Sequence, residues 1–487
     1  MPTPFHFFLR NMWLAAGGDH VFLNQVQLIG KGQLASPFAV TELASGSIAA
    51  AGLAVAEWTQ RRFDVRHQIH IDQRLASLWF ATSLRPQGWQ LPPAWDAIAG
   101  DYPCRDGWIR LHTNAAHHRH AALQVLGCAA ERDTVAAAVA GWYGAELESA
   151  IVQAGGCAAQ MRSTDDWAMH AQGTAVLQEP LLHRALHTHA HTQASRSALA
   201  DKMADPSRPL AGIKVLDLTR ILAGPVATRF LAGFGADVLR IDPPGWDEVS
   251  AAPEVTLGKR CARLDLRKPD DRQQLEQLLA EADVLIHGYR PEALEKLGLG
   301  TSKRRELNPA LVDICLDAYG WTGPWSKRRG FDSLVQMSSG IAEAGMRLSG
   351  ANRPQPLPVQ ALDHATGYLL ATAAIRGLTD RLQHGVGCES RASLARTARL
   401  LVCVSTDEQA KPPIAAEQQD DLQPHLEHTY WGPARRLQVP LRFDPVSVLA
   451  ENAEPLTMCW SFPAGPLGSA NAEWVAVNLP SAPVTSL

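Results

Sequence analysis

Short runs of apolar residues alternate with amphipathic segments in the middle of the chain. The first run, residues 213–218, is continuous and apolar, which is typical of a strand buried on both faces. Gly224 and Pro225 follow it and predict the start of a helix, because proline is favoured in the first helical turn. We expect this helix to end at Gly235, where an apolar run over residues 236–242 predicts the next strand.

The alternation of strands and helices continues beyond this unit. Residues 269–282 form an amphipathic pattern that places Leu275, Leu278 and Leu279 on one stripe of a predicted helix. The remaining elements are a strand over 283–289, a short helix after Pro291 and a strand over 311–320. Strands that alternate with helices usually pair in parallel. The pattern therefore predicts an α/β fold with a Rossmann-like, doubly wound parallel sheet, with another α/β layer as the alternative.

Two polar stretches with little hydrophobic pattern divide the chain. Residues 192–209 and residues 404–425 are rich in charged and small polar residues and read as linkers. They separate an N-terminal module over residues 1–191, a large domain over 210–403 and a C-terminal tail over 426–487. The tail contains many proline and tryptophan residues, and its pattern assigns it to no fold.

A short pattern occurs twice along the chain. Residues 42–52 (ELASGSIAAAG) and 363–373 (DHATGYLLATA) both place an acid, an alanine and a Ser-Gly or Thr-Gly pair before small residues. Thirty residues after each acid, at Asp72 and at Ser393, a similar apolar segment begins. Chance similarity of alanine-rich helices is one explanation. We favour a partial duplication, in which the N-terminal module repeats the later part of the central unit.

Charge and cysteine content narrow the class of protein. The 45 Lys and Arg residues nearly balance the 49 Asp and Glu residues, which argues against a nucleic-acid or membrane-surface role. No apolar stretch approaches the roughly 20 residues of a membrane span, and the first residues do not read as a signal peptide. The eight cysteines form no C-x-x-C pair, which argues against structural zinc and thioredoxin-like redox sites. Free thiols in a chain of this size suggest a reducing compartment. We therefore expect a cytoplasmic protein.

Several longer strings occur in the central module in a fixed order. They are VLDLTRILAGPVATRFLAGFGADVLRIDPPG, LGKRCARLDLRKP, ADVLIHGYRPEALEKLGLG, GFDSLVQMSSG and LDHATGYLLATAAI. Together they resemble the large domain of the family III (CaiB/BaiF-type) coenzyme A transferases. The string AGDYPCRDGWIRLHTNAAHHR, within residues 100–180, resembles the smaller α+β domain that normally follows the large one. Here it comes first, so the modules are rearranged or partly duplicated.

The resemblance implies a CoA-transferase (EC 2.8.3-type) that moves coenzyme A from an acyl-CoA to a free carboxylic acid through an aspartyl-CoA thioester. Asp363, in LDHATG, matches the family's catalytic aspartate. A carboxylate suits this role because it is ionised at neutral pH and gives an activated acyl group. We expect the small residues after it to let the thioester approach the backbone. From the residue alone, a helix cap is the favoured interpretation of Asp363. The whole motif string favours the catalytic role.

The resemblance also implies a set of CoA-binding residues. They are Arg220, Leu222, Lys259, Arg260, Tyr289, Arg290, Lys296, Phe331 and Asp332, the last two near the thioester. The chain departs from the family pattern at Thr256 and around His287, which leaves the CoA contacts open. Glu42 matches Asp363 in the N-terminal copy. Its side chain is one methylene longer, so we interpret Glu42 as a relic or a structural cap.

Two other functions remain as alternatives. An acyl-CoA racemase or isomerase would need a histidine before the aspartate, and this chain has Phe331 before Asp332, which cannot act as a base. A non-catalytic CoA-binding relative is the second alternative. In either case CoA is a substrate or ligand rather than a permanently bound cofactor. The acids exchanged are not named by the family. An interlocked homodimer or an intrachain pseudo-dimer is expected.

Histidine clusters and glycine motifs add no further site. We interpret the histidines in LHRALHTHAH (His183, His187, His189 and His191) as a polar surface segment rather than a metal site, because no cysteine or carboxylate completes a ligand set. The HHRH string over residues 117–120 is expected to be structural. The first strand-to-helix turn lacks G-x-G-x-x-G, which excludes the usual NAD-binding motif.

Overall fold

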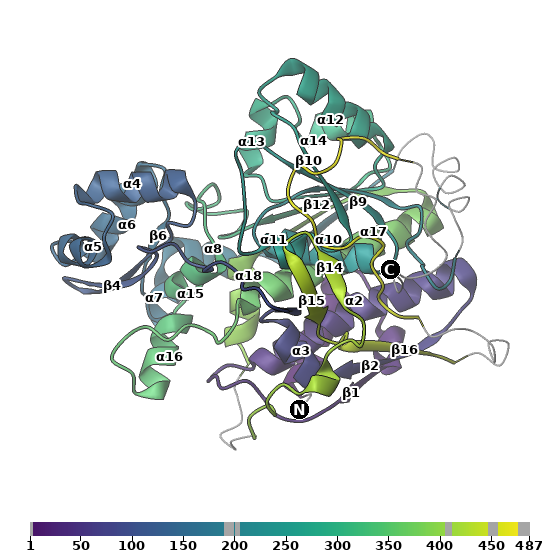
Figure 1. The fold of residues 1–487 in the computed structure, drawn as a ribbon, viewed down its shortest axis with the longest axis horizontal. Helices are drawn as coiled ribbons and strands as arrows, with labels where there is room; N and C mark the ends of the chain where they lie inside the picture. The colour runs from purple at the N-terminus through teal and green to yellow at the C-terminus, as the bar shows by residue number, and fades with distance from the viewer. Residues whose placement is uncertain (1–2, 189–198, 200–204, 405–411, 447–455, 476–487) are drawn as a thin grey trace.

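A seven-stranded sheet lies at the centre of the computed structural model, which describes residues 3–188, 199, 205–404, 412–446 and 456–475 (Figure 1). Its strand order is β10-β9-β8-β11-β12-β13-β7. The pairs are parallel except for β7, which lies antiparallel to β13 at one edge. The strands are β8 (Lys214–Leu218), β9 (Asp237–Asp242), β10 (Lys259–Arg263), β11 (Val284–His287), β12 (Val312–Asp317), β13 (Gly387–Ser393) and β7 (His183–His187).

The six parallel strands have a recognisable order. Numbered from β8 along the chain, they lie in the order 3-2-1-4-5-6, as in open doubly wound sheets. The chain therefore leaves β8 in one direction and β11 in the other, which opens a crevice at their carboxyl ends. The prediction of a mixed α/β fold with a large, mostly parallel sheet is confirmed.

Helices cover both faces of this sheet. Alternate side chains of each strand pack against the helices on one face or on the other. Helices α10 (Ala223–Gly233) and α17 (Ala361–His384) share one apolar core with Val215 and Val284. Leu216 and Leu285 point to the opposite face, where α12 (Pro269–Glu281) buries its leucines. Successive residues of a strand face opposite sides, so strands buried on both faces must be apolar throughout. Helices α13 (Pro291–Lys296), α14 (Thr301–Leu307) and α11 (Ala252–Val255) complete the connections.

The sequence predicts most of these elements correctly. The strands predicted over 213–218, 236–242, 283–289 and 311–320 correspond to β8, β9, β11 and β12. The helices predicted after Gly224, over 269–282 and after Pro291 correspond to α10, α12 and α13. The edge strand β10 was not predicted, because its residues Lys259 and Arg260 interrupt the apolar pattern.

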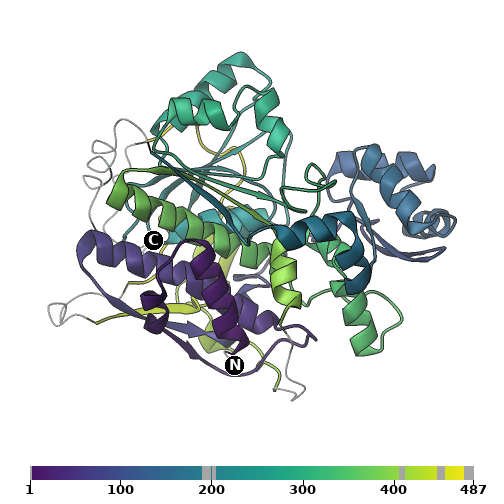
Figure 2. The ribbon, with the colours of Figure 1, turned by 180° about the vertical axis from the view of Figure 1, so that it is seen from behind.

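The N-terminal module lies against the central one through two long helices. Helix α2 (Val40–Phe63) packs along α17, and both helices have 24 residues (Figure 2). Helix α1 (Pro4–Ala15) packs on α2 at Gly46, where a Cβ atom would lie 2.8 Å from the Cβ of Phe8. The rest of this module is η1 (His20–Gln25), β1 (Val26–Ile29), β2 (His67–Asp72), α3 (Gln73–Trp79) and β3 (Leu84–Pro86).

A separate lobe projects beside the sheet (Figure 1). It contains the antiparallel sheet β4-β5-β6 and three helices with a core of their own. The elements are β4 (Gly100–Cys104), β5 (Gly107–Leu111), α4 (Ala116–Leu126), α5 (Arg132–Val139), α6 (Gly144–Gln153) and β6 (Ala158–Gln160). Helices α7 (Thr164–Met169), α8 (Ala171–Gln178), α15 (Asp332–Ser338) and α18 (Leu394–Val402) lie between this lobe and the large sheet. Helix α16 (Ile341–Ser349) lies below α15 in Figure 1.

The C-terminal tail joins small sheets of the N-terminal module. Strands β14 (Glu427–Thr429) and β15 (Gly432–Arg436) extend from β3, while β16 (Leu441–Pro445) pairs with β2. Most of the predicted first linker and residues 405–411 of the second lie outside the described residues. The described part of the second linker contains η2 (Gln419–Asp421) and reaches Arg74 through Asp421. The domain boundaries stay predictions.

Candidate active site

A cavity of about 390 Å³ opens at the carboxyl ends of the central strands. Leu218 and Thr219 at the end of β8, Gly288 after β11 and Leu316 and Asp317 of β12 line it. This is the point where the strand order reverses, and open α/β sheets bind ligands at that position. The fold therefore places this cavity where a substrate is expected.

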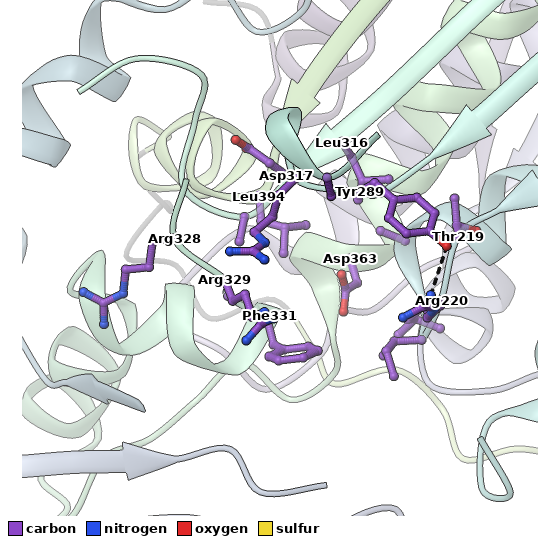
Figure 3. A pocket seen from close by; sticks show the side chains of 18 of the residues that line it. Thr219, Arg220, Tyr289, Leu316, Asp317, Arg328, Arg329, Phe331, Asp363 and Leu394 are labelled. Atoms are coloured by element: carbon purple, nitrogen blue, oxygen red, sulfur yellow. Dashed lines mark hydrogen bonds between the residues drawn. The ribbon is translucent and has the colours of Figure 1, made fainter. Parts of the chain in front are cut away.

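Asp363 is the third residue of α17, and its carboxylate points into this cavity (Figure 3). It lies between Arg220 and Tyr289 on one side and Phe331 and Arg329 on the other. The residue is 9% exposed, and no described residue donates a hydrogen bond to its carboxylate. A buried acid without a donor is unusual, because burying an unpaired polar group costs free energy.

A second acid, Asp332, lies behind the first turn of α17. Its carboxylate accepts a hydrogen bond from the backbone nitrogen of Asp363 at 2.9 Å and another from the side-chain amide of Gln336. Gln336 in turn accepts a hydrogen bond from the backbone nitrogen of Leu357 at 2.7 Å. Asp332 was predicted as a CoA contact near the thioester, but it does not line the cavity and instead holds the start of α17.

Burial changes the protonation of both acids. Desolvation raises the pKa of Asp332 to about 6, although the hydrogen bonds that it accepts favour its charged form. Desolvation, together with the neighbouring Asp332 charge, raises the pKa of Asp363 well above its usual range. The expectation that Asp363 is ionised at neutral pH did not include this upward shift of its pKa, because the sequence pattern does not show burial.

The small residues after Asp363 serve packing. At Gly367 a Cβ atom would lie 2.5 Å from the carbonyl oxygen of Ala223, so only glycine lets α17 approach the start of α10 so closely. This contact brings the loop after β8 to the base of Asp363. Our expectation that these residues admit the thioester does not hold at Gly367, where the space is already filled.

An arginine between two aromatic rings forms one wall of the cavity. The Arg220 guanidinium lies 4.8 Å from the ring centroid of Trp246 and 5.4 Å from that of Tyr289. It also donates a hydrogen bond to the Tyr289 hydroxyl at 3.1 Å. Leu222 lines the same wall. Aromatic faces hold the cation in place while leaving its outward donors available to an anion.

The cavity is strongly cationic at neutral pH. Arg220, Arg290 and Arg329 line it, and none of them forms an ion pair with an acid in the described parts of the chain. Arg328, also in the lining, is paired with Glu148 at 3.1 Å. The acids in the lining are Asp363 and Asp317, and burial raises the pKa of Asp317 to about 8. The arginine charges therefore stay largely uncompensated, which favours an anionic ligand.

Besides Asp332, three of the predicted CoA contacts lie away from the cavity lining. Lys259 is buried and donates hydrogen bonds to Asp217 at 3.1 Å and to Thr228 at 2.6 Å. Arg260 pairs with Asp237 at 2.9 Å on the outer strand β10. Lys296 is exposed on α13. Arg220, Leu222, Tyr289, Arg290 and Phe331 do line the cavity with Asp363.

Histidines of the small lobe complete the cavity wall, and the sequence analysis did not predict this role. His117 and His118, at the start of α4, line it. The His112 ring stacks on Phe331 with centroids 3.7 Å apart. Burial lowers the pKa of His112 and of His118 to about 3, so both rings are neutral at pH 7. The only sequence signal was the HHRH string inside the small-domain resemblance.

The other candidates lie outside this site. Glu42 is the third residue of α2, as Asp363 is of α17, but it does not line the cavity. His183 and His187 belong to the edge strand β7, whereas His189 and His191 lie outside the described residues. Within the described ranges, no three His, Cys, Asp or Glu side chains gather as a metal-ion site. No described helix has both the length and the apolarity to cross a membrane.

Comparison with known proteins shows which family and which proteins this chain is similar to. Residues 210–434 match the family model described as CoA-transferase family III. The probable fatty acyl-CoA transferase Rv3272 of Mycobacterium tuberculosis is 36% identical over 202 residues, which cover 37% of this chain and 49% of that protein. Human succinyl-CoA:glutarate CoA-transferase is 32% identical over 195 residues, covering 37% of this chain and 44% of its own.

A solved structure shows a similarity of the same kind. The CAIB/BAIF family protein from Brucella suis has 27% sequence identity and a TM-score of 0.36, over 46% of this chain and 65% of that one. The chain spans about half the length of the curated relatives it matches.

Proposed function

We propose that this chain, whose residues 210–434 belong to the family III CoA-transferases, moves coenzyme A from an acyl-CoA to a free carboxylic acid through Asp363. The observation that carries the proposal is the Asp363 carboxyl group itself. It lies in a cavity lined by arginines at the switch point of the sheet, and none of the described residues donates a hydrogen bond to it. Relatives named as CoA-transferases support transfer of CoA in general.

The proposed chemistry is two exchanges at one side chain. The Asp363 carboxylate attacks the acyl-CoA thioester, which forms a mixed anhydride and releases the CoA thiolate. The thiolate attacks the aspartyl carbonyl of the anhydride, which forms aspartyl-CoA and releases the donor acid. The acceptor acid then attacks aspartyl-CoA to form a second anhydride and free thiolate. Attack of the thiolate on the acceptor's carbonyl gives the new acyl-CoA and restores Asp363.

The surroundings of Asp363 suit these steps. With 9% exposure, the side chain has little access to water, which would hydrolyse an anhydride. The raised pKa makes its ionised form a better nucleophile, at the cost of a smaller ionised fraction. Arg220 and Arg290 lie where they can bind the CoA phosphates, since guanidinium groups bind phosphate well.

The alternative of α-proton abstraction has weaker support. Phe331 occupies the position of the racemase base, as the sequence indicates. His118 lies in the cavity, but its Nε2 lies 3.5 Å from the Cys157 sulfur and its pKa is lowered to about 3 by burial. Such a histidine is a weak base at neutral pH. The other alternative, a non-catalytic CoA-binding protein, is distinguished from a transferase by an assay of CoA transfer.

We also propose that the chain contains a partial duplication. Helices α2 and α17 have equal lengths, and their N-caps, Ala39 and Gln360, have similar backbone angles (φ −74°, ψ 57° and φ −74°, ψ 62°). Each is followed by a strand and then by a helix capped by a side chain, Asp72 before α3 and Ser393 before α18.

The arrangement of the modules supports an intrachain pseudo-dimer. His117 and His118 of the N-terminal module line the cavity of the large domain, so one chain supplies both walls. We propose a Rossmann-like large domain from the strand order, and an enzyme that works in the cytoplasm without a permanently bound cofactor. An interlocked homodimer remains the alternative assembly, which the mass in solution would identify.

A substrate screen tests the proposal. Purified protein is incubated with acyl-CoA donors and free acids, and new acyl-CoA products are measured by mass spectrometry. We expect transfer to at least one acid and loss of transfer in Asp363→Asn, which keeps the size of the side chain. Uptake of solvent deuterium at the α-carbon without transfer would favour the racemase. CoA binding without turnover on a broad panel would favour the non-catalytic relative.

A further inference from the structure

The loop between β8 and α10 contains a strained residue beside the cavity. Ile221 has a φ of 68°, in the left-handed region that β-branched residues avoid. Asp64 is the other residue besides glycine with positive φ in the described ranges, and it caps the end of α2. A strained conformation of this kind persists only where the surroundings enforce it, and such residues cluster at functional sites.

One buried carboxylate holds this loop. Glu248 is 6% exposed, and its Oε1 accepts a hydrogen bond from the Ile221 backbone nitrogen at 2.7 Å. The same oxygen accepts a hydrogen bond from the Trp246 indole nitrogen at 2.9 Å. Its other oxygen, Oε2, accepts a hydrogen bond from Arg240 at 2.9 Å. Arg240 thus fixes the carboxylate, and the carboxylate fixes both the loop and the indole.

These two anchored groups, together with Tyr289, set the place of Arg220. Arg220 directly precedes Ile221, so the Ile221 peptide sets the direction of its backbone. The Trp246 ring lies 4.8 Å from the Arg220 guanidinium and limits where that side chain can lie. Glu248 itself does not line the cavity. Its influence on a ligand must therefore pass through Arg220 and Trp246.

We propose that Glu248 is a positioning residue that holds Ile221 in its left-handed conformation and so presents Arg220 to the anionic part of CoA. The inference rests on the proposed function, because it takes CoA as the ligand. Loss of the carboxylate lets Ile221 relax toward the ordinary backbone regions, and Arg220 then leaves its place between the two rings.

A double-mutant cycle tests this assignment. We expect Glu248→Ala to weaken CoA binding, measured by calorimetry, about 10-fold, as for loss of a charge-assisted hydrogen bond. The KM for acyl-CoA rises by a similar factor while kcat stays nearly constant, because Arg220 binds substrate and transition state alike. Glycine adopts left-handed angles without strain. In the Ile221→Gly background, Glu248→Ala should therefore weaken binding by less than about 3-fold.

Two further variants keep the test independent of folding. Glu254→Ala removes another buried carboxylate, which pairs with Arg229 and Arg436 away from the cavity lining, and should leave the CoA affinity of the folded fraction unchanged. Glu248→Gln places one donor where the carboxylate accepts. It should weaken binding about 3-fold, again less with Ile221→Gly.

The possible outcomes distinguish a failure of the proposed role of Glu248 from a failure of the proposed CoA-transfer function. Equal CoA affinity for the parent and for Glu248→Ala would overturn the role of Glu248, and so would the same loss in both backgrounds at position 221. A lower kcat with unchanged KM would point to a purely structural role and also overturn it. A parent protein that binds no CoA would contradict the proposed function, and the inference with it.

Discussion

The carboxylate of Asp332 accepts a hydrogen bond from the backbone nitrogen of Asp363 at 2.9 Å, so two buried acids meet at the start of α17. Asp332 receives the free N–H groups of the helix terminus, which favour its negative charge. Asp363 faces the cavity, receives no such hydrogen bond from the part of the chain that the structure describes, and is repelled by the neighbouring charge. The first proton of the pair therefore resides on Asp363 in the protein without ligand.

This arrangement predicts a pH-dependent gain in stability for Asp363→Asn. Both acids have a higher pKa in the folded protein than the value of about 3.9 in an unfolded chain. The folded state therefore binds protons more tightly, and the parent loses stability as the pH rises from about 4 through the folded pKa values. The Asp363→Asn substitution removes one of the two titrating carboxyl groups and with it the charge that repels Asp332.

We expect the melting temperature of Asp363→Asn to exceed that of the parent at pH 8 and to equal it near pH 4. Each pKa unit between the folded and unfolded states corresponds to about 1.4 kcal/mol. Differential scanning calorimetry across this pH range measures the difference. A variant that is less stable than the parent at pH 8 would contradict the burial of an unpaired acid at this position.

The activity should depend on pH for the same reason. The nucleophile is the ionised form of Asp363, so we expect kcat/KM to rise with pH at values well above the usual aspartate pKa. Asp332→Asn keeps an oxygen for the Asp363 backbone nitrogen but removes the neighbouring charge. In the pH profile of the Asp332→Asn variant, the rise of kcat/KM should therefore occur at lower pH than in the parent. A parent profile that is flat above pH 5 would contradict this prediction.

Glu42 and Asp363 provide a matched comparison. Both are the third residue of a 24-residue helix, but only Asp363 lines the cavity. We expect Glu42→Gln to leave kcat/KM for CoA transfer within about 2-fold of the parent, and Asp363→Asn to lower it by at least about 10³-fold, as for removal of a nucleophile. Steady-state assays measure both. A large loss in Glu42→Gln with normal stability would assign Glu42 a catalytic role.

Much of the fold could be predicted because inner parallel strands are buried on both faces. Strands β8 and β11 appear in the sequence as continuous apolar runs for this reason. The edge strands β10 and β7 lack the pattern, since each has only one neighbouring strand and carries polar residues such as Lys259 and His183. The inner strand β13 was missed as well, because Glu389, Ser390 and Arg391 interrupt its apolar pattern.

Residues of the site could be predicted only where they lie within one continuous segment that resembles the family. Asp363 and Arg220 lie within strings that resemble the family, so their place followed from the chain itself. His118 enters the cavity from a lobe far away in sequence, and no local pattern predicts that contact. Two other features depend on packing, which spacing along the chain does not specify. They are the buried ion pair between Lys259 and Asp217 and the raised pKa of Asp363.

The most direct test is to trap the intermediate on Asp363. The protein is mixed with an acyl-CoA that it uses, quenched in acid, digested and examined by mass spectrometry. We predict a peptide containing Asp363 that carries CoA as a thioester, is cleaved by hydroxylamine and is absent from Asp363→Asn. An active protein whose Asp363 peptide stays unmodified, or whose adduct lies on another residue, would contradict the account.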